Sequence, residues 1–127
     1  MNENEIAREI VDAAYKVHTT LGPGLLESAY ETVLAYELRE RGLVVDLQKP
    51  MPVIYEDVTI EVGFRADMVV EDKVIVELKS VEHTSPVHKK QLLTYLRLAD
   101  KRLGLLINFG STLIKNGITR VVNRLEE

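Results

Sequence analysis

The stretch Gly63-Phe-Arg-Ala-Asp-Met-Val-Val-Glu-Asp-Lys-Val-Ile-Val-Glu-Leu-Lys79 decides the fold that we expect for this chain. Its one polar, turn-like break is Glu71-Asp-Lys73, which predicts a β-hairpin centred near Asp72. That centre places Asp67 directly opposite Glu77. A slip by one residue would pair charged side chains with apolar ones, so the pattern specifies this register strongly.

The two faces of the predicted hairpin differ in polarity, because successive side chains of a strand point to opposite faces. One face is wholly apolar and suited to burial: Ala66, Met68, Val70, Val74, Val76 and Leu78. The other face carries charged side chains at the end far from the turn: Asp67, Glu77 and Lys79, with Arg65 opposite Lys79. Nearer the turn, this face carries two apolar side chains, Val69 and Ile75.

The opposed carboxylates indicate a cation site. Directly opposed positions have Cβ atoms roughly 4.5–5.5 Å apart, so Asp67 and Glu77 repel unless a cation lies between them. Oxygen ligands suit Mg²⁺ or Mn²⁺. Lys79 points the same way and could orient a water molecule or stabilise charge on a phosphate. The competing interpretation is a solvated surface with a cross-strand ion pair, against which Val69 and Ile75 indicate a partly covered face.

The rest of the chain predicts one α/β domain over residues 1–127, in the order α-α-β-β-β-β-α-β-β. Pro50 and Pro52 make the neighbourhood of Met51 a poor central strand. We expect helices over Glu3–Leu21, Leu25–Arg41 and Pro86–Lys101, and strands over Leu43–Leu47, Met51–Tyr55, Val58–Val70, Val74–Val81, Leu103–Phe109 and Ile118–Val122.

Two helices offer further candidates. Glu27 falls in the first turn of the second helix, where the helix dipole alone accounts for most glutamates. It also lies between Leu26 and Ala29, close to the core-facing stripe, where a carboxylate without a partner would be costly. Gln91 and Tyr95, four residues apart on the third helix, offer hydrogen bonds on a face otherwise rich in leucine. Alone, that pair indicates only helix packing and solvation.

Composition sets limits on function. The chain has no cysteine, which excludes disulfides and thiolate chemistry and fits a reducing cytoplasm. No secretory signal or membrane-spanning apolar run is visible, so we expect a cytoplasmic protein without a membrane partner. The formal net charge of −4 and pI near 5.4 are unusual for a nucleic-acid binder. Two bound divalent cations would offset this charge, and a basic rim could add to them: Arg65, Lys89, Lys90, Lys101 and Arg102.

Three motifs together resemble a known family. Asp67, followed after nine residues by Glu77-Leu78-Lys79, resembles the D…ExK signature of PD-(D/E)xK nucleases. Gly24-x-x-Glu27-x-x-Tyr30 resembles the motif of the GxxExxY proteins, a prokaryotic family assigned to that superfamily. Gln91-x-x-x-Tyr95 is similar to the QxxxY element of RecB-like nucleases. Ala66 replaces the proline of the superfamily name, which many members lack.

This resemblance implies a restriction-endonuclease-like core, with a central mixed β-sheet flanked by helices. It implies a Mg²⁺ (or Mn²⁺) site made by Asp67, Glu77 and the backbone carbonyl of Leu78. Glu27 corresponds to the extra helical acid that RecB-like enzymes and archaeal Holliday-junction resolvases place near the metal. Lys79, Gln91 and Tyr95 would complete the catalytic set. The implied activity is metal-dependent hydrolysis of phosphodiester bonds in nucleic acid, with DNA as the expected substrate.

Two alternatives stay open at this point. The first is a catalytically inactive nuclease-fold module that binds nucleic acid or a protein partner; retention of the acids and the lysine disfavours it. The second is a histidine metal site of a different hydrolase, built from His18, His83 and His88, whose spacing is not that of a helical ligand pair. A homodimer would fit a small nuclease that cuts two strands, although the sequence does not identify an interface.

Overall fold

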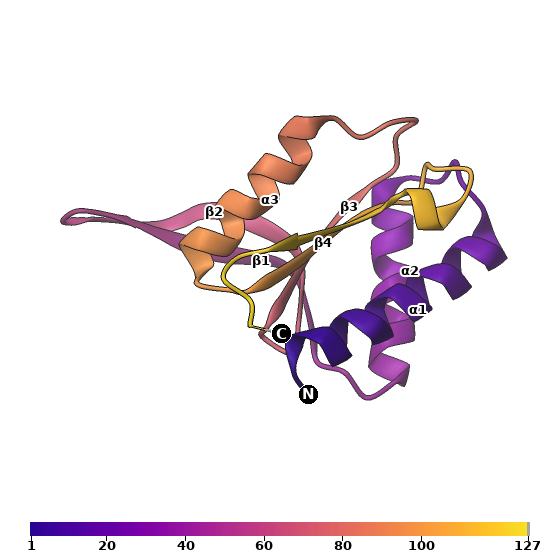
Figure 1. Cartoon of the computed structure of the whole chain (residues 1–127), viewed down its shortest axis with the longest axis horizontal. Coiled ribbons are helices and arrows are strands. Elements are labelled where there is room, and N and C mark those ends of the chain that lie inside the picture. Colours follow the sequence, from indigo (N-terminus) through magenta and orange to yellow (C-terminus); the bar gives the residue numbers. More distant parts are fainter. Residues whose placement is uncertain (127) are drawn as a thin grey trace.

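The computed structural model describes residues 1–126 and shows helices packed on both faces of a mixed sheet (Figure 1). Strand order is β1-β2-β3-β4-β5, and β3 and β4 are the parallel pair, joined by the crossover through α3. The elements are α1 (Glu3–Leu21), α2 (Glu27–Glu40), β1 (Val45–Tyr55), β2 (Val58–Val70), β3 (Val74–Lys79), α3 (Pro86–Ala99), β4 (Leu103–Asn108), the 3-10 turn η1 (Ile114–Asn116) and β5 (Ile118–Val122).

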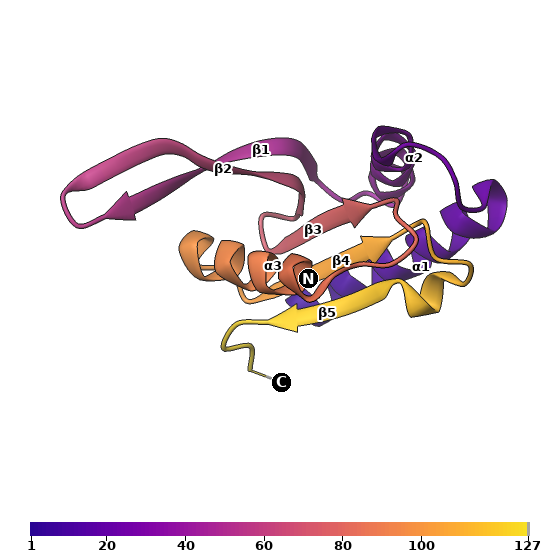
Figure 2. The same ribbon diagram turned by 90° about the horizontal axis from the view of Figure 1, so that it is seen from above.

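Two apolar cores lie on the two faces of the sheet. Helices α1 and α2 cover one face and α3 covers the other (Figures 1 and 2). The larger core includes Ile6 and Ile10 of α1, Tyr30 and Leu34 of α2, and Met68, Val70, Val74 and Val76 of the sheet. The smaller core joins Leu92 and Leu96 of α3 to Ala66, Val69, Ile75 and Leu106. Both sides of β3 are therefore buried, which explains its nearly continuous apolar sequence.

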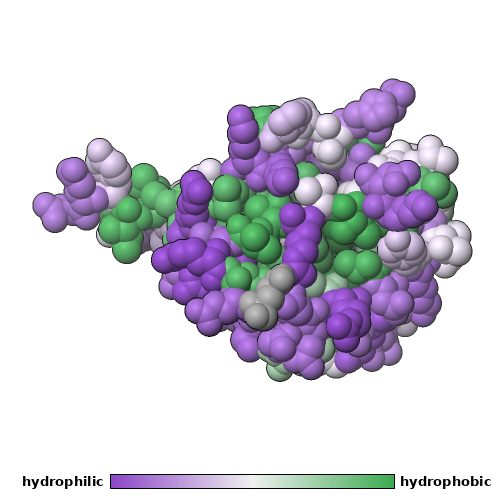
Figure 3. Space-filling model, in the orientation of Figure 1, coloured by the Kyte–Doolittle hydropathy of each residue, from purple (hydrophilic) through white to green (hydrophobic). Residues whose placement is uncertain are grey.

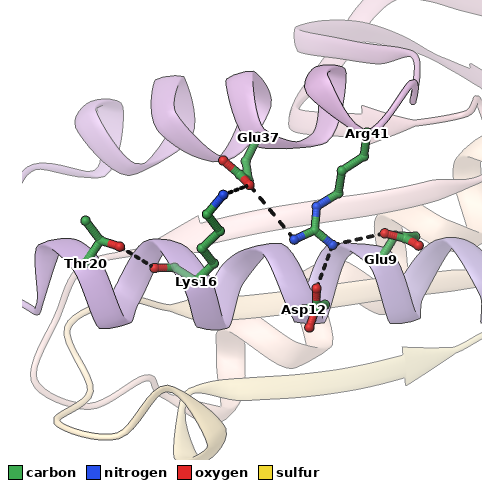
Figure 4. Close-up of polar contacts among 6 residues, drawn as sticks. All are labelled: Glu9, Asp12, Lys16, Thr20, Glu37 and Arg41. Carbon is green, nitrogen blue, oxygen red and sulfur yellow. Dashed lines mark hydrogen bonds and ion pairs between the residues drawn. The ribbon is translucent and has the colours of Figure 1, made fainter.

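Helices α1 and α2 are tied together by ion pairs (Figure 4). The Arg41 guanidinium at the end of α2 lies 2.7 Å from an Asp12 carboxylate oxygen and 3.0 Å from one of Glu9. Lys16 pairs with Glu37 at 2.6 Å. The hydrogen bond that Arg41 donates to the Asp12 carboxylate raises the pKa of Arg41 above its ordinary value, although desolvation lowers it. These contacts fix α2, and with it the acids of its first turns, relative to the rest of the fold.

One prediction about the strands is wrong. Residues 45–55 form the single strand β1, so the observed order is α-α-β-β-β-α-β-β rather than one with an additional strand. Pro50 and Pro52 are accommodated because β1 lies at the edge of the sheet. One side of an edge strand has no neighbouring strand, so a proline there does not remove a hydrogen bond of the ladder. The pairing of β1 with β2 shifts register between Met51 and Val53.

Beyond that shift, β1 and β2 continue as a two-stranded arm that extends away from the helices (Figures 1 and 2). Apolar side chains gather along it and hydrophilic residues form its tip (Figure 3). Gly63 allows the Val53 side chain to lie across the opposite strand, because a Cβ at this position would collide with it.

The start of α2 also differs from the prediction. The helix begins at Glu27, and Leu26 is 76% exposed rather than part of the core-facing stripe. Glu27 is itself exposed. The argument that an unpaired carboxylate there would be buried at a cost is therefore wrong.

No helix in residues 1–126 combines the length and the apolarity needed to traverse a lipid bilayer.

Candidate active site

The site forms where β2 separates from β3. The ladder between these strands runs from Val70–Val74 to Met68–Val76, the register predicted for a turn at Asp72. At the next position a side chain, rather than a backbone carbonyl of β2, accepts the hydrogen bond from β3. The acceptor is Asp67 Oδ2, and the donor is the Leu78 N–H at 2.9 Å. The ladder between β2 and β3 ends at Met68–Val76, so the predicted pair of Arg65 with Lys79 does not form, and Arg65 pairs instead with Pro50 of β1.

The two predicted acids do meet at this opening. The Asp67 backbone N–H donates to Glu77 Oε1 at 3.4 Å. The Glu77 carboxylate therefore lies against Asp67, the residue that carries the second carboxylate. Strand β3 is held on its far side by the parallel ladder, in which Glu77 opposes Leu106. Asp67, Glu77 and Leu78 are therefore brought together by backbone pairing as well as by their side chains.

The separation of the strands changes which face Ala66 occupies. Ala66 is buried with Val69 and Ile75 in the core beneath α3, and not with Met68 as strict alternation predicts. Opposite this point, Gln48 has the left-handed φ of 48°, and the pairs of β1 with β2 pass from Leu47–Met68 to Lys49–Ala66. The break in alternation on β2 therefore lies opposite the left-handed Gln48, where the ladder skips one pair but keeps its register.

Burial controls the protonation of Glu77. This residue is only 8% exposed. Desolvation, followed by a side-chain hydrogen bond with Asp67 and the Asp67 charge, raises the pKa of Glu77 to about 9, against a smaller opposing effect of Lys79. Without a cation, Glu77 therefore holds a proton at neutral pH. A divalent cation would reverse this preference, because a metal ligand must be deprotonated.

A cavity of about 180 Å³ adjoins Asp67 on the side of α2. Glu27 contributes to it from the exposed start of the helix, so it lines the same cavity as Asp67 and Leu78, whereas Glu77 is not part of the lining. The lining is Glu27, Ser28, Glu31, Gln48, Asp67 and Leu78. Among residues 1–126, no three Asp, Glu, His or Cys side chains converge as a group arranged to hold a metal.

The donor set nevertheless fits a hard cation. Two carboxylates meet where burial already disfavours the charge of one of them. The Leu78 N–H bonds Asp67, and the carbonyl of the same residue would be the third oxygen donor. Oxygen donors of this kind suit Mg²⁺ and Mn²⁺, which keep several water ligands and need few protein groups. Asp67 and Glu77 would be the protein carboxylates of such a site.

On the opposite face, α3 places Tyr95 close to the acids. Its ring stacks on Phe64 of β2, with centroids 4.1 Å apart and planes 8° from parallel. Burial and the charges of Glu77 and Asp67 raise the pKa of Tyr95, whereas a side-chain hydrogen bond with Gln91 lowers it. Gln91 is exposed, and its connection to the acids runs through this hydrogen bond with Tyr95.

Lys79 ends β3 and is half-buried. The strand end is held by Asn108, whose Oδ1 accepts from the Val81 N–H and whose Nδ2 donates to the Val81 carbonyl, at 3.0 and 2.9 Å. The predicted basic rim is only partly at this end. Lys101 bonds the Asp72 turn and Arg102 pairs with Asp100, at the opposite end of β3, so neither can border the site.

The histidines do not form a site. His18 is buried and its Nε2 bonds the Ser111 carbonyl oxygen at 2.8 Å. The His83 side chain is 88% exposed, and His88 bonds the Ser85 N–H at the start of α3. Within the described part of the chain, no metal-binding group of three such side chains includes them.

Sequence reasoning missed Gln48 and Glu31, which line the cavity beside Asp67. Glu31 follows Glu27 by one helical turn, and that spacing could have indicated it. Gln48 carries no comparable signal, because glutamine in a strand gives no sign of a left-handed backbone.

Comparison with known proteins supports the geometry. The family model of the PD-(D/E)XK nuclease superfamily matches residues 4–121, nearly the whole chain. No curated protein and no solved structure matches it significantly. With the family match, the predicted restriction-endonuclease-like core is confirmed: a mixed five-stranded sheet in residues 1–126, flanked by helices. The finer assignment to the GxxExxY proteins stays a prediction.

Proposed function

The chain belongs to the PD-(D/E)XK nuclease superfamily, and on that basis we propose that it hydrolyses phosphodiester bonds of nucleic acid with Mg²⁺ or Mn²⁺. The observation that carries the proposal is the meeting of Asp67 and Glu77 at the split between β2 and β3. Superfamily membership alone supports the fold better than the reaction. The position of these two acids is what supports the chemistry.

Each group has a distinct role in the proposed reaction. Asp67, Glu77 and the Leu78 carbonyl hold the cation, with Glu27 available from the rim of the cavity. When bound, the cation supplies a water of lowered pKa and a Lewis acid for the phosphate. Lys79 orients the attacking water or stabilises negative charge on the phosphate.

On the α3 face, Tyr95 and Gln91 orient the phosphate or the Lys79 ammonium. The stack of Tyr95 on Phe64 restricts the tyrosine ring, so its hydroxyl is held in one direction. A fixed donor next to the reacting group lowers the barrier through positioning.

We propose DNA as the substrate. The formal charge of −4 makes binding without metal weak. Three exposed cations could contact the phosphates: Lys89 and Lys90, which precede Gln91 on α3, and Arg65, two residues before Asp67. Binding should therefore depend on both metal and salt concentration. Tight DNA binding that persists in EDTA would contradict this account.

We also propose a homodimer for duplex substrates, because cutting both strands requires two such sites. Sedimentation velocity with and without duplex DNA tests this assembly. A protein that stays monomeric in both conditions while cutting both strands would contradict it. Cytoplasmic location stays a prediction.

The direct test is a cleavage assay on single-stranded and duplex DNA and RNA with Mg²⁺ or Mn²⁺. Glu77→Ala and Lys79→Ala should abolish cleavage. Glu56→Ala in the arm and Lys73→Ala at the hairpin turn remove the same charges from exposed positions and should retain it. Cleavage that survives both site variants would contradict the proposal. Binding without cleavage under every condition would favour the inactive module.

A further inference from the structure

Gln48 has an unfavourable backbone conformation beside the candidate site. Its φ of 48° lies in the left-handed region, which is unfavourable for an L-residue other than glycine because Cβ comes too close to the following carbonyl oxygen. The surrounding strand β1 is otherwise extended. Strained backbone of this kind persists where neighbouring contacts require it, and it is concentrated at functional sites.

The Gln48 side chain connects two acids from different elements. Its Nε2 lies 2.7 Å from Glu31 Oε1 of α2 and 3.4 Å from Asp67 Oδ1 of β2. Ionised carboxylates only accept hydrogen bonds, and an amide NH₂ has two protons to donate. The chemistry of the two neighbours therefore assigns the nitrogen, rather than the oxygen, of the Gln48 amide to this position.

This contact completes the support of Asp67. Oδ2 of Asp67 accepts from the Leu78 N–H on β3, and Oδ1 faces the Gln48 amide. Each carboxylate oxygen is thus held by a different strand. Without the amide, Glu31 and Asp67 would face each other across the cavity with no donor between them.

We propose that Gln48 is a positioning residue for the metal-binding carboxylate of Asp67, anchored by Glu31. The proposal rests on the function proposed above for Asp67. The Gln48 amide donates to both acids, reduces their mutual repulsion and fixes the orientation in which Asp67 meets a cation. Outer partners of this type change metal affinity by about 10- to 100-fold when they are removed.

The test compares Gln48→Asn with the wild-type protein. Asparagine tolerates a left-handed backbone better than most residues, but its amide is one methylene shorter and cannot bridge the two acids. We expect the Mn²⁺ dissociation constant, measured by titration calorimetry, to rise about tenfold or more. The two hydrogen bonds lost are exposed, and one is long at 3.4 Å. Because asparagine is also less strained at a left-handed φ, these effects oppose each other and thermal stability in EDTA should change little. A glutamine that served only the fold would give the reverse, with lower stability and unchanged Mn²⁺ affinity.

Two Glu31 variants separate the tether from the charge. Glu31→Gln keeps an acceptor for Gln48 and should leave Mn²⁺ affinity within about threefold of wild type, whereas Glu31→Ala should weaken it about as much as Gln48→Asn. Equal losses in Glu31→Gln and Glu31→Ala would overturn the anchoring role.

The outcome for Gln48 can be distinguished from the outcome for the nuclease. Wild-type Mn²⁺ affinity in Gln48→Asn, together with metal-dependent cleavage by the wild-type protein, overturns only the positioning role. A wild-type protein that neither binds Mn²⁺ nor cleaves nucleic acid overturns both proposals.

Discussion

Replacing Glu77 with glutamine should make the metal-free protein more stable at alkaline pH. The substitution keeps the size and hydrogen-bonding capacity of the side chain but removes its ionisation. In the wild-type protein, burial and Asp67 raise the pKa of Glu77 from 4.5 to about 9. The folded state therefore binds a proton that the unfolded chain releases at a much lower pH.

The sign and size of the effect follow from proton linkage. Because the folded pKa is the higher one, the stability associated with Glu77 is complete below pH 4.5. It is lost as the pH rises toward 9. Each pH unit in this interval costs about 1.4 kcal/mol, so the loss by pH 8 is at most about 5 kcal/mol. Water entry around an ionising carboxylate reduces this, and we expect about 2–5 kcal/mol.

Urea denaturation in EDTA at pH 5.5, 7 and 8 measures this difference. The free energy of unfolding of the wild-type protein should decrease relative to Glu77→Gln as the pH rises, because other titrating groups contribute equally to both. Saturating Mn²⁺ should remove most of the pH dependence of the wild-type protein, because the bound carboxylate is ionised throughout.

A parallel pH dependence in the two proteins would refute the reasoning. It would mean that the Glu77 carboxylate reaches solvent in the folded protein, and that the adjoining Asp67 charge is not felt there.

Three further predictions concern the scaffold. Arg41→Met removes the cation shared by Asp12 and Glu9 and should cost about 1 kcal/mol in urea denaturation, less in high salt because the partners are partly exposed; a salt-independent loss would contradict this. Asn108→Ala removes the amide that clamps Val81 and should cost about 2–4 kcal/mol, with faster amide exchange at Val81; unchanged exchange would show that the clamp is not needed. Gly63→Ala should cost about 1–2 kcal/mol because the new Cβ meets the Val53 side chain, and a double-mutant cycle with Val53→Ala should recover most of it; additive losses would place the strain elsewhere.

The register of the site hairpin was predictable because Glu71-Asp72-Lys73 is the one polar break between two apolar runs. Val69–Ile75 and Met68–Val76 pair as the pattern requires, and Asp67 and Glu77 come together as a result. The periodicity of α1 likewise predicted its bounds, Glu3–Leu21. Where one face is buried, a local pattern determines the pairing.

Other features depend on tertiary placement, which the sequence does not record. Pro50 and Pro52 appeared to interrupt a strand, but β1 continues through them because it is an edge strand. The left-handed Gln48 and the burial of Ala66 in the α3 core are local departures from strand alternation, and no residue pattern marks them in advance. Glu27 is exposed at the cavity rim because α2 begins at that residue.

The most direct test of the metal site is a crystal structure obtained with Mn²⁺, with data collected to reveal anomalous scattering. The account predicts an anomalous peak bounded by the carboxylates of Asp67 and Glu77 and the carbonyl of Leu78. A fully loaded crystal in which Mn²⁺ binds elsewhere, with Glu77 still protonated against Asp67, would contradict it.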